Sequence, residues 1–137
     1  MKRGLAVVHV IVPTHDPRLI AGYYTLSSVS VELADLPPEV ARRVPYRSVP
    51  GFLLGRLAVA TAYQGKGLGA FLLSAALRIC RDAASKYVAG RIVVVDALDE
   101  GAAAFYRKYG FAPLETTPGY PARLMLPVAS LPPPEGR

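Results

Sequence analysis

Hydrophobic runs and proline-rich breaks divide the chain into an ordered series of elements. Two β-branched and aromatic runs, Leu5–Val12 and Leu19–Val31, are separated by the turn sequence PTHDPR, which predicts an N-terminal antiparallel hairpin. A short helix opened by two prolines is expected over Leu36–Val44. After a second proline-rich break, the continuous apolar run Phe52–Ala60 predicts another strand.

In the second half of the chain, segments with the spacing of apolar residues typical of helices alternate with short apolar runs typical of strands. Arg91–Leu98 is a short β-branched run, typical of a strand that is covered on both faces. A helix on each side is expected, over Lys66–Lys86 and Asp99–Tyr109, the second ended by Gly110. Arg123–Val128 predicts a final strand. The apolar positions of the longer helix follow a spacing of three and four residues: Leu68, Phe71, Leu72, Ala75, Ile79 and Ala83.

The order of these elements predicts an α/β fold with a mixed sheet, in which a central parallel strand-helix-strand unit follows the hairpin and a C-terminal strand completes the sheet. At 137 residues and 52% hydrophobic, the chain is expected to form one domain, residues 1–128, followed by a proline-rich disordered tail, residues 129–137.

The composition bears on the cellular location of the protein and on the chemistry of its Cys and His residues. No apolar run approaches the roughly 18 residues that a membrane span requires, and a secretory signal is not recognisable at the N-terminus. The expected location is therefore the cytoplasm. Cys80 has no partner for an internal disulfide and is expected to be a buried, inert thiol. His9 and His15 are too few and too isolated to indicate a metal site.

The stretch YQGKGLG carries the clearest chemical signal. Gly65, Gly67 and Gly69 stand directly before a predicted helix, where free backbone N–H groups and the helix dipole favour an anion. Lys66 and Gln64 can add side-chain donors. The spacing does not fit a P-loop, which needs Gly-Lys followed by Ser or Thr, or the dinucleotide pattern G-x-G-x-x-G. The pattern that remains is Q-x-x-G-x-G.

Charge is distributed unevenly along the chain. The net charge is +6, and seven Arg or Lys residues with no Asp or Glu lie between Ala41 and Arg81. Such a region attracts polyanions without specificity. A solvated basic face and a nucleic-acid interface are equally compatible with this pattern.

Two motifs together resemble the GNAT superfamily of N-acetyltransferases, in which Q/R-x-x-G-x-G/A binds the pyrophosphate of acetyl-CoA. The second motif is a capped helix, D-x-x-A-x-x-F-Y-x-x-x-G-F. It matches here at Asp99, Ala102, Phe105, Tyr106, Gly110 and Phe111. Within the superfamily, GYYTLSSVSVELADLP, LLGRLAV and LMLPV resemble the acetyltransferase toxins of bacterial toxin-antitoxin modules. The resemblance covers roughly Leu5 to Val128.

The resemblance implies a site of defined parts. Tyr106 would be the general acid that protonates the departing thiolate. No metal is implied. Splayed strands, Gly55–Ala60 and Val93–Ala97, would leave strand amides free for the acetyl-CoA arm. The implied cofactor-binding residues are Leu57, Val59, Gln64, Gly65, Lys66, Gly67, Leu68, Gly69, Ala70, Asp99 and Phe105, with Asp99 expected to act mostly as a helix cap.

For the toxin-type relatives the resemblance implies aminoacyl-tRNA as substrate, a small antitoxin encoded next door and a homodimer, with Arg42, Arg43 and Arg47 as expected phosphate contacts. Two alternatives stay open: acetylation of a small amine or protein N-terminus, and an inactive CoA-binding remnant. Because only Met1–Gly4 precede the first predicted strand, the domain is expected to lack the N-terminal acceptor-site helices usual in the family. Glu32 and Asp35 are the candidates considered for a general base.

Overall fold

Six strands form one mixed sheet in the order β1-β2-β3-β4-β6-β5. The computed structural model describes residues 7–36, 38, 47–86, 92–114 and 119–131. The strands are β1 (Val7–Ile11), β2 (Gly22–Glu32), β3 (Ser48–Val59), β4 (Ile92–Ala97), β5 (Ala112–Pro113) and β6 (Ala122–Pro127), and the helices are α2 (Leu68–Lys86) and α3 (Glu100–Lys108). Short 3-10 turns cover Leu33–Asp35, Thr61–Tyr63 and Val128–Ser130.

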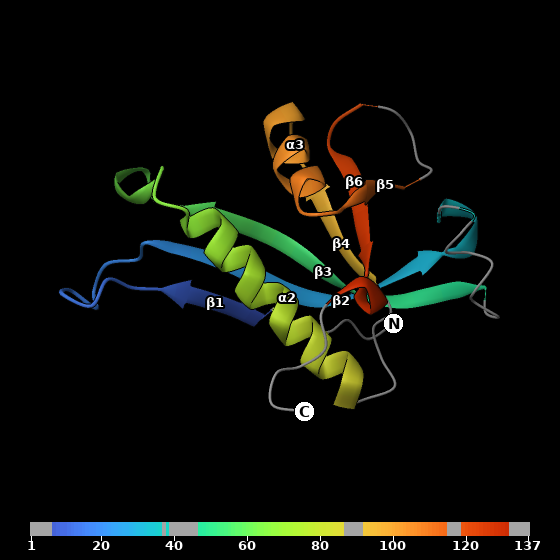
Figure 1. Cartoon of the computed structure of the whole chain (residues 1–137), viewed down its shortest axis with the longest axis horizontal. Helices are drawn as coiled ribbons and strands as arrows, with labels where there is room; N and C mark the ends of the chain where they lie inside the picture. The colour runs from blue at the N-terminus through green and yellow to red at the C-terminus, as the bar shows by residue number, and fades with distance from the viewer. Residues whose placement is uncertain (1–6, 37, 39–46, 87–91, 115–118, 132–137) are drawn as a thin grey trace.

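Strand pairing confirms the expected architecture. β1 and β2 form the antiparallel hairpin, β3 and β4 are parallel with α2 between them in sequence, and β6 returns antiparallel beside β4. Figure 1 shows α2 lying across β2 and β3, and α3 beside the C-terminal end of β4. β3 begins earlier than the apolar run suggested because Ser48 pairs with Glu32 at the end of the long β2.

The sheet has two differently covered faces. The helix face carries Tyr24, Leu54, Val93 and Val95, which share one buried cluster with side chains of α2 and α3. The far face carries a second buried cluster of Val31, Leu36, Val49, Ile92, Val94, Leu114 and Met125. Side chains along β4 thus alternate between the two clusters, which confirms the expectation of a strand covered on both faces.

The buried face of α2 differs from the expected one. Leu72 is buried as predicted and Cys80 is a buried thiol as expected, but Phe71 is 59% exposed, and the helix also buries Leu73 and Ala76. The sequence around Phe71 is apolar on adjacent sides of the helix, so the periodicity admits two neighbouring faces. Packing against β2 and β3 selected one of them.

The C-terminal boundary also needs correction. Ala129 and Ser130 belong to a 3-10 turn, and Leu131 packs against the helix-face cluster, so the expected disordered tail does not begin at residue 129. The other tail residues, from 132 onward, lie outside the described residues, as does most of the helix expected over Leu36–Val44. In the described part of the chain, no helix is long and apolar enough to cross a membrane.

Candidate active site

The parallel ladder between β3 and β4 stops partway along both strands. Pairing runs from Gly51 opposite Ile92 to Leu54 opposite Val95, and both strands then continue without pairing to each other. Figure 1 shows them diverging beyond this point. We call the region between residues 55–59 and 96–97 the interstrand gap. It is shorter on β4 than expected from the sequence, because residues 93–95 remain paired.

A β-bulge at Gly55 accompanies the divergence. Leu26 pairs with Leu54 and Thr25 with Arg56, so Gly55 has no counterpart on β2. The Arg56 N–H donates to Thr25 Oγ1 at 3.0 Å. A Cβ on Gly55 would lie 2.8 Å from that same oxygen, so a larger residue here would have to displace the Thr25 hydroxyl that accepts the Arg56 N–H. The bulge turns β3 away from β4 where the gap begins.

The backbone of β3 presents amides to the gap. The N–H groups of Arg56 and Ala60 point to the β2 side, since they bond to Thr25 Oγ1 and to the Ala21 carbonyl. N–H groups alternate in direction along a strand. Those of Leu57 and Val59 therefore point into the gap, which agrees with the choice of these two residues from the sequence.

The glycine loop before α2 offers a row of free donors. Gly65 and Gly67 both have a φ of 80°, and a Cβ on either would meet nothing within 4 Å. Among the described residues, the N–H groups of residues 65–70 have no backbone acceptor, and the first one bonded is that of Phe71, to the Gly67 carbonyl at 3.1 Å. Such a row at a helix N-terminus is suited to phosphate.

Gln64 ties this loop to the end of β3. Its side-chain nitrogen donates to the Val59 carbonyl at 3.0 Å, on the gap side of the strand. The sequence predicted a phosphate donor at this position. The observed bond fixes the glycine loop against the gap, so that both features form one continuous surface, and the donor role of Gln64 stays a prediction. Lys66 is exposed beside it.

α3 completes the site from the other side. Asp99 caps the helix by accepting the Ala102 N–H at 2.9 Å, which confirms its structural role. Phe105 lies next to Gly69 of α2, and its ring makes edge contacts with Tyr106 and Tyr109 at centroid distances of 5.3 Å. The loop and α3 are therefore packed directly against each other.

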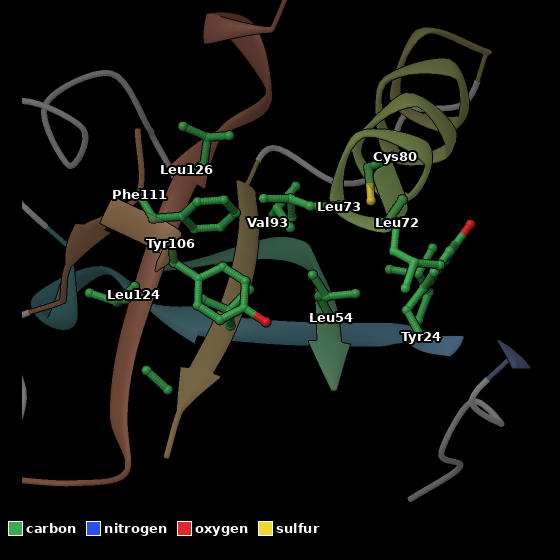
Figure 2. Packing of buried hydrophobic residues seen from close by; sticks show 14 of the residues in the cluster. Tyr24, Leu54, Leu72, Leu73, Cys80, Val93, Tyr106, Phe111, Leu124 and Leu126 are labelled. Carbon is green, nitrogen blue, oxygen red and sulfur yellow. The ribbon is translucent and has the colours of Figure 1, made fainter. Parts of the chain in front are cut away.

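Tyr106 is buried within the helix-face cluster. Its side chain is 7% exposed, and its ring packs edge-on against Phe111 at 5.5 Å. Figure 2 shows the hydroxyl on the side of the ring away from Phe111. Burial raises the pKa of this hydroxyl from 10.0 to about 12. The phenol is therefore protonated at neutral pH and can donate a hydrogen bond, but it gives up its proton reluctantly.

The general-base candidates from the sequence do not reach the gap. Glu32 pairs with Ser48, seven residues before Gly55, which is about 23 Å along β3. Asp35 lies in the turn that follows Glu32. The carboxylate that the sequence analysis missed is Asp96, directly after the last paired residue of β4. The available signal was a lone acid within an otherwise apolar run.

The expected nucleic-acid contacts are only partly described. Arg47 is exposed just before β3, at the end remote from the gap, and Arg42 and Arg43 lie outside the described residues. Within the described residues, no three His, Cys, Asp or Glu side chains gather as a metal site would require.

Comparison with known proteins gives consistent matches. The family description "Acetyltransferase (GNAT) domain" matches residues 20–113. A Mycobacterium tuberculosis protein named "tRNA-acetylating toxin" is 43% identical over 115 residues, which are 84% of this chain and 66% of that protein. The chain thus spans slightly under two thirds of this relative's length.

Two solved structures are similar in fold. The structure of AtaT complexed with acetyl-methionyl-tRNAfMet matches with a TM-score of 0.79 and 33% identity, over 90% of this chain and 71% of the other. The AtaT Y144F mutant toxin bound to the C-terminus of the antitoxin AtaR and acetyl-CoA matches with a TM-score of 0.64 and 30% identity, over 81% and 61%. With the family match across most of its length, this chain belongs to the GNAT acetyltransferase family.

Proposed function

We propose that this protein is an acetyl-CoA-dependent N-acetyltransferase, of the toxin type that acetylates the amino group of aminoacyl-tRNA and so blocks translation. The observation that carries the proposal is the continuous surface of free N–H groups. It runs from residues 65–70 to the gap-facing amides of Leu57 and Val59, with Gln64 joining the two parts.

The glycine loop and the gap fit different parts of acetyl-CoA. The N–H groups at the start of α2 suit a pyrophosphate, and the amides of Leu57 and Val59 suit the carbonyl groups of a chain that adds to the open side of β3. Acetyl-CoA supplies an acetyl group that is already activated as a thioester. The protein therefore has mainly to align an amine and stabilise charge.

Tyr106 is proposed to act on the leaving sulfur. It belongs to the same buried cluster as Leu54 and Val95, the last paired residues before the gap. With a pKa of about 12, its hydroxyl keeps its proton in the resting protein and can donate a hydrogen bond to a developing thiolate.

The proposed acceptor rests on the relatives and on charge. The relatives include a protein named tRNA-acetylating toxin and a toxin solved with acetyl-methionyl-tRNA. A net charge of +6 favours a polyanionic substrate. Arg42, Arg43 and Arg47 are the proposed phosphate contacts. Because charged tRNA is a cytoplasmic substrate, the protein is proposed to act in the cytoplasm.

The proposed partners come from the same comparison. A similar toxin has been solved with the C-terminus of its antitoxin, and we propose a small antitoxin for this chain as well. A homodimer is expected from the resemblance, and analytical ultracentrifugation would measure the oligomeric state. Residues 1–128 are proposed to act as one acetyltransferase domain.

The direct test is acetyl transfer from labelled acetyl-CoA to separate pools of charged tRNA, histone-like protein and polyamines, with deacylated tRNA as control. The proposal expects label on charged tRNA and none on deacylated tRNA. Label on polyamines or protein alone would favour the alternative acetyltransferases. CoA binding without transfer to any pool would favour the inactive remnant.

A further inference from the structure

Asp96 and Arg123 form a two-point ion pair between β4 and β6. Arg123 Nε donates to Asp96 Oδ1 at 2.8 Å and Arg123 Nη2 to Oδ2 at 2.9 Å. The two residues are direct partners in the strand register. The Asp96 side chain is nevertheless 35% exposed. A carboxylate has about four lone-pair positions, so each oxygen retains acceptor capacity beyond its bond to Arg123.

The position of Asp96 in the sheet is specific. It follows Val95, the last residue of β4 that pairs with β3, and therefore borders the interstrand gap. Val95 and Ala97 belong to the helix-face cluster, while Val94 belongs to the cluster on the far face. By the alternation along a strand, Asp96 projects to the far face.

The far face is also the accessible side of the gap. α2 and α3 cover the helix face, where the glycine loop and Tyr106 lie. On β3 across the gap, Arg56 and Ala58 are exposed. The buried far-face cluster lies toward the other end of β3, around Val49. We therefore expect a large acceptor to approach the gap from the side to which Asp96 projects, where its side chain is 35% exposed.

Other described carboxylates are placed elsewhere. Glu32 and Asp35 lie at the remote end of β2, and Asp99 is engaged as the cap of α3. Glu100 accepts hydrogen bonds from Arg107 and Tyr120, and Asp16 is paired with Arg18 in the hairpin turn. Asp82 lies in the C-terminal half of α2. Among the described acids, Asp96 alone lies on a strand that borders the gap.

We propose that Asp96, held by Arg123, is the acceptor-amine subsite: its carboxylate accepts a hydrogen bond from the α-amino group of the incoming aminoacyl-tRNA at the far face of the gap. The inference rests on the proposed function. It assigns a chemical role to a pair that neither motif of the family resemblance includes.

The pairing with Arg123 explains how a carboxylate can bind the amine without keeping it in the unreactive ammonium form. An isolated carboxylate would stabilise the ammonium form, which cannot attack a thioester. Arg123 offsets most of that charge, so the pair can orient the amine without strongly retaining its extra proton. The two bonds to Asp96 also raise the pKa of Arg123, which keeps the guanidinium charged throughout.

The test separates amine recognition from turnover. The probes are methionyl-tRNA with a non-hydrolysable amide linkage and the same tRNA carrying the acyl group without its amine. Binding of each is measured by calorimetry with CoA present, so that no acetyl transfer occurs. Wild type is expected to bind the amine-bearing probe at least tenfold more tightly. Asp96→Ala, which removes both acceptor oxygens, should reduce this preference below threefold.

Arg123→Gln is the matched variant, because it breaks the same ion pair and leaves the carboxylate. It is expected to retain the tenfold preference and to shift the midpoint of the rise in transfer rate with pH upward, since the unpaired carboxylate holds the ammonium form more strongly. If the ion pair is purely structural, both variants should lose the preference for the amine-bearing probe equally, and that result would overturn the proposal. Thermal melting of both variants reports any shared loss of stability.

Failure of this proposal is distinguishable from failure of the proposed function. If wild type binds both probes equally well, the amine subsite is overturned while tRNA binding stands. If wild type binds neither probe, the proposed substrate is itself overturned, and the subsite with it.

Discussion

Gly69 at the start of α2 lies beside the ring of Phe105 in α3: a Cβ on Gly69 would sit 3.7 Å from Cε1 and Cζ of that ring. This contact joins the glycine loop to the helix that carries Tyr106. The proposed phosphate site and the proposed acid therefore belong to one packed unit, although Gly69 and Tyr106 are 37 positions apart in the sequence.

Leucine at Gly67 or Gly69 is expected to weaken CoA binding by well over tenfold, measured by calorimetry. At Gly67 the φ of 80° disfavours any other residue, and a side chain would screen the free N–H groups. At Gly69 the leucine would start from a Cβ already in contact with the Phe105 ring at 3.7 Å, and the rest of its side chain would occupy space beside the free N–H groups. Gly119→Leu is the control, because Gly119 also has a positive φ and open space but lies before β6. Equal effects at Gly67 and Gly119 would contradict the assignment of the loop.

Tyr106→Phe is expected to lower turnover by about 10² to 10⁴, the range for loss of an acid at the leaving group. CoA affinity should be nearly unchanged, because the ring keeps its edge contact with Phe111. Tyr109→Phe, at the exposed C-cap of the same helix, should lose little activity. A turnover loss below threefold for Tyr106→Phe would assign that residue to packing alone.

The pH profile of transfer should lack an alkaline decline below pH 10. The pKa of Tyr106 is raised to about 12 by burial, so the phenol remains protonated over this range. Turnover with an amide-linked acceptor should rise as its α-amino group loses a proton, near pH 7.7 to 8.0 for a reference amine. Activity falling with a midpoint below pH 10 would show that another group supplies the proton.

Cys80 should resist thiol reagents in the folded protein. Its side chain is fully buried, and burial raises its pKa from 9.0 to about 12, so the reactive thiolate is scarce at pH 8. Labelling at pH 8 should be slow in buffer and fast in urea. Rapid labelling in buffer would mean that α2 opens readily from the sheet.

Binding of charged tRNA should depend steeply on salt. Each lost phosphate contact reduces the salt slope by about 0.7 to 0.9, so reversing two of Arg42, Arg43 and Arg47 should flatten it by roughly 1.5. Arg18→Glu is the control, because Arg18 is exposed and already paired with Asp16 in the hairpin turn, at the opposite end of β2 from Arg47. An affinity that does not vary with salt would favour the small-amine acetyltransferase.

The sequence by itself determined the features that depend on neighbouring residues. Asp99 capping α3, Gly110 with a φ of 102° after it, and the glycines at the start of α2 each follow from local backbone geometry. The order of strands and helices followed from periodicity, because strands and helices bury side chains at different spacings. These local signals sufficed to indicate the family and the cofactor loop.

Tertiary structure decided what depends on strand register and on packing between distant segments. The register placed Glu32 at the wrong end of β3 for a base, and the bulge at Gly55 fixed where the gap begins. It also placed Asp96 beside Arg123 at the edge of that gap, a pairing between residues 27 positions apart. Such relationships arise from hydrogen bonds between strands, and a one-residue shift would reverse every side chain, so no pattern within one segment can specify them.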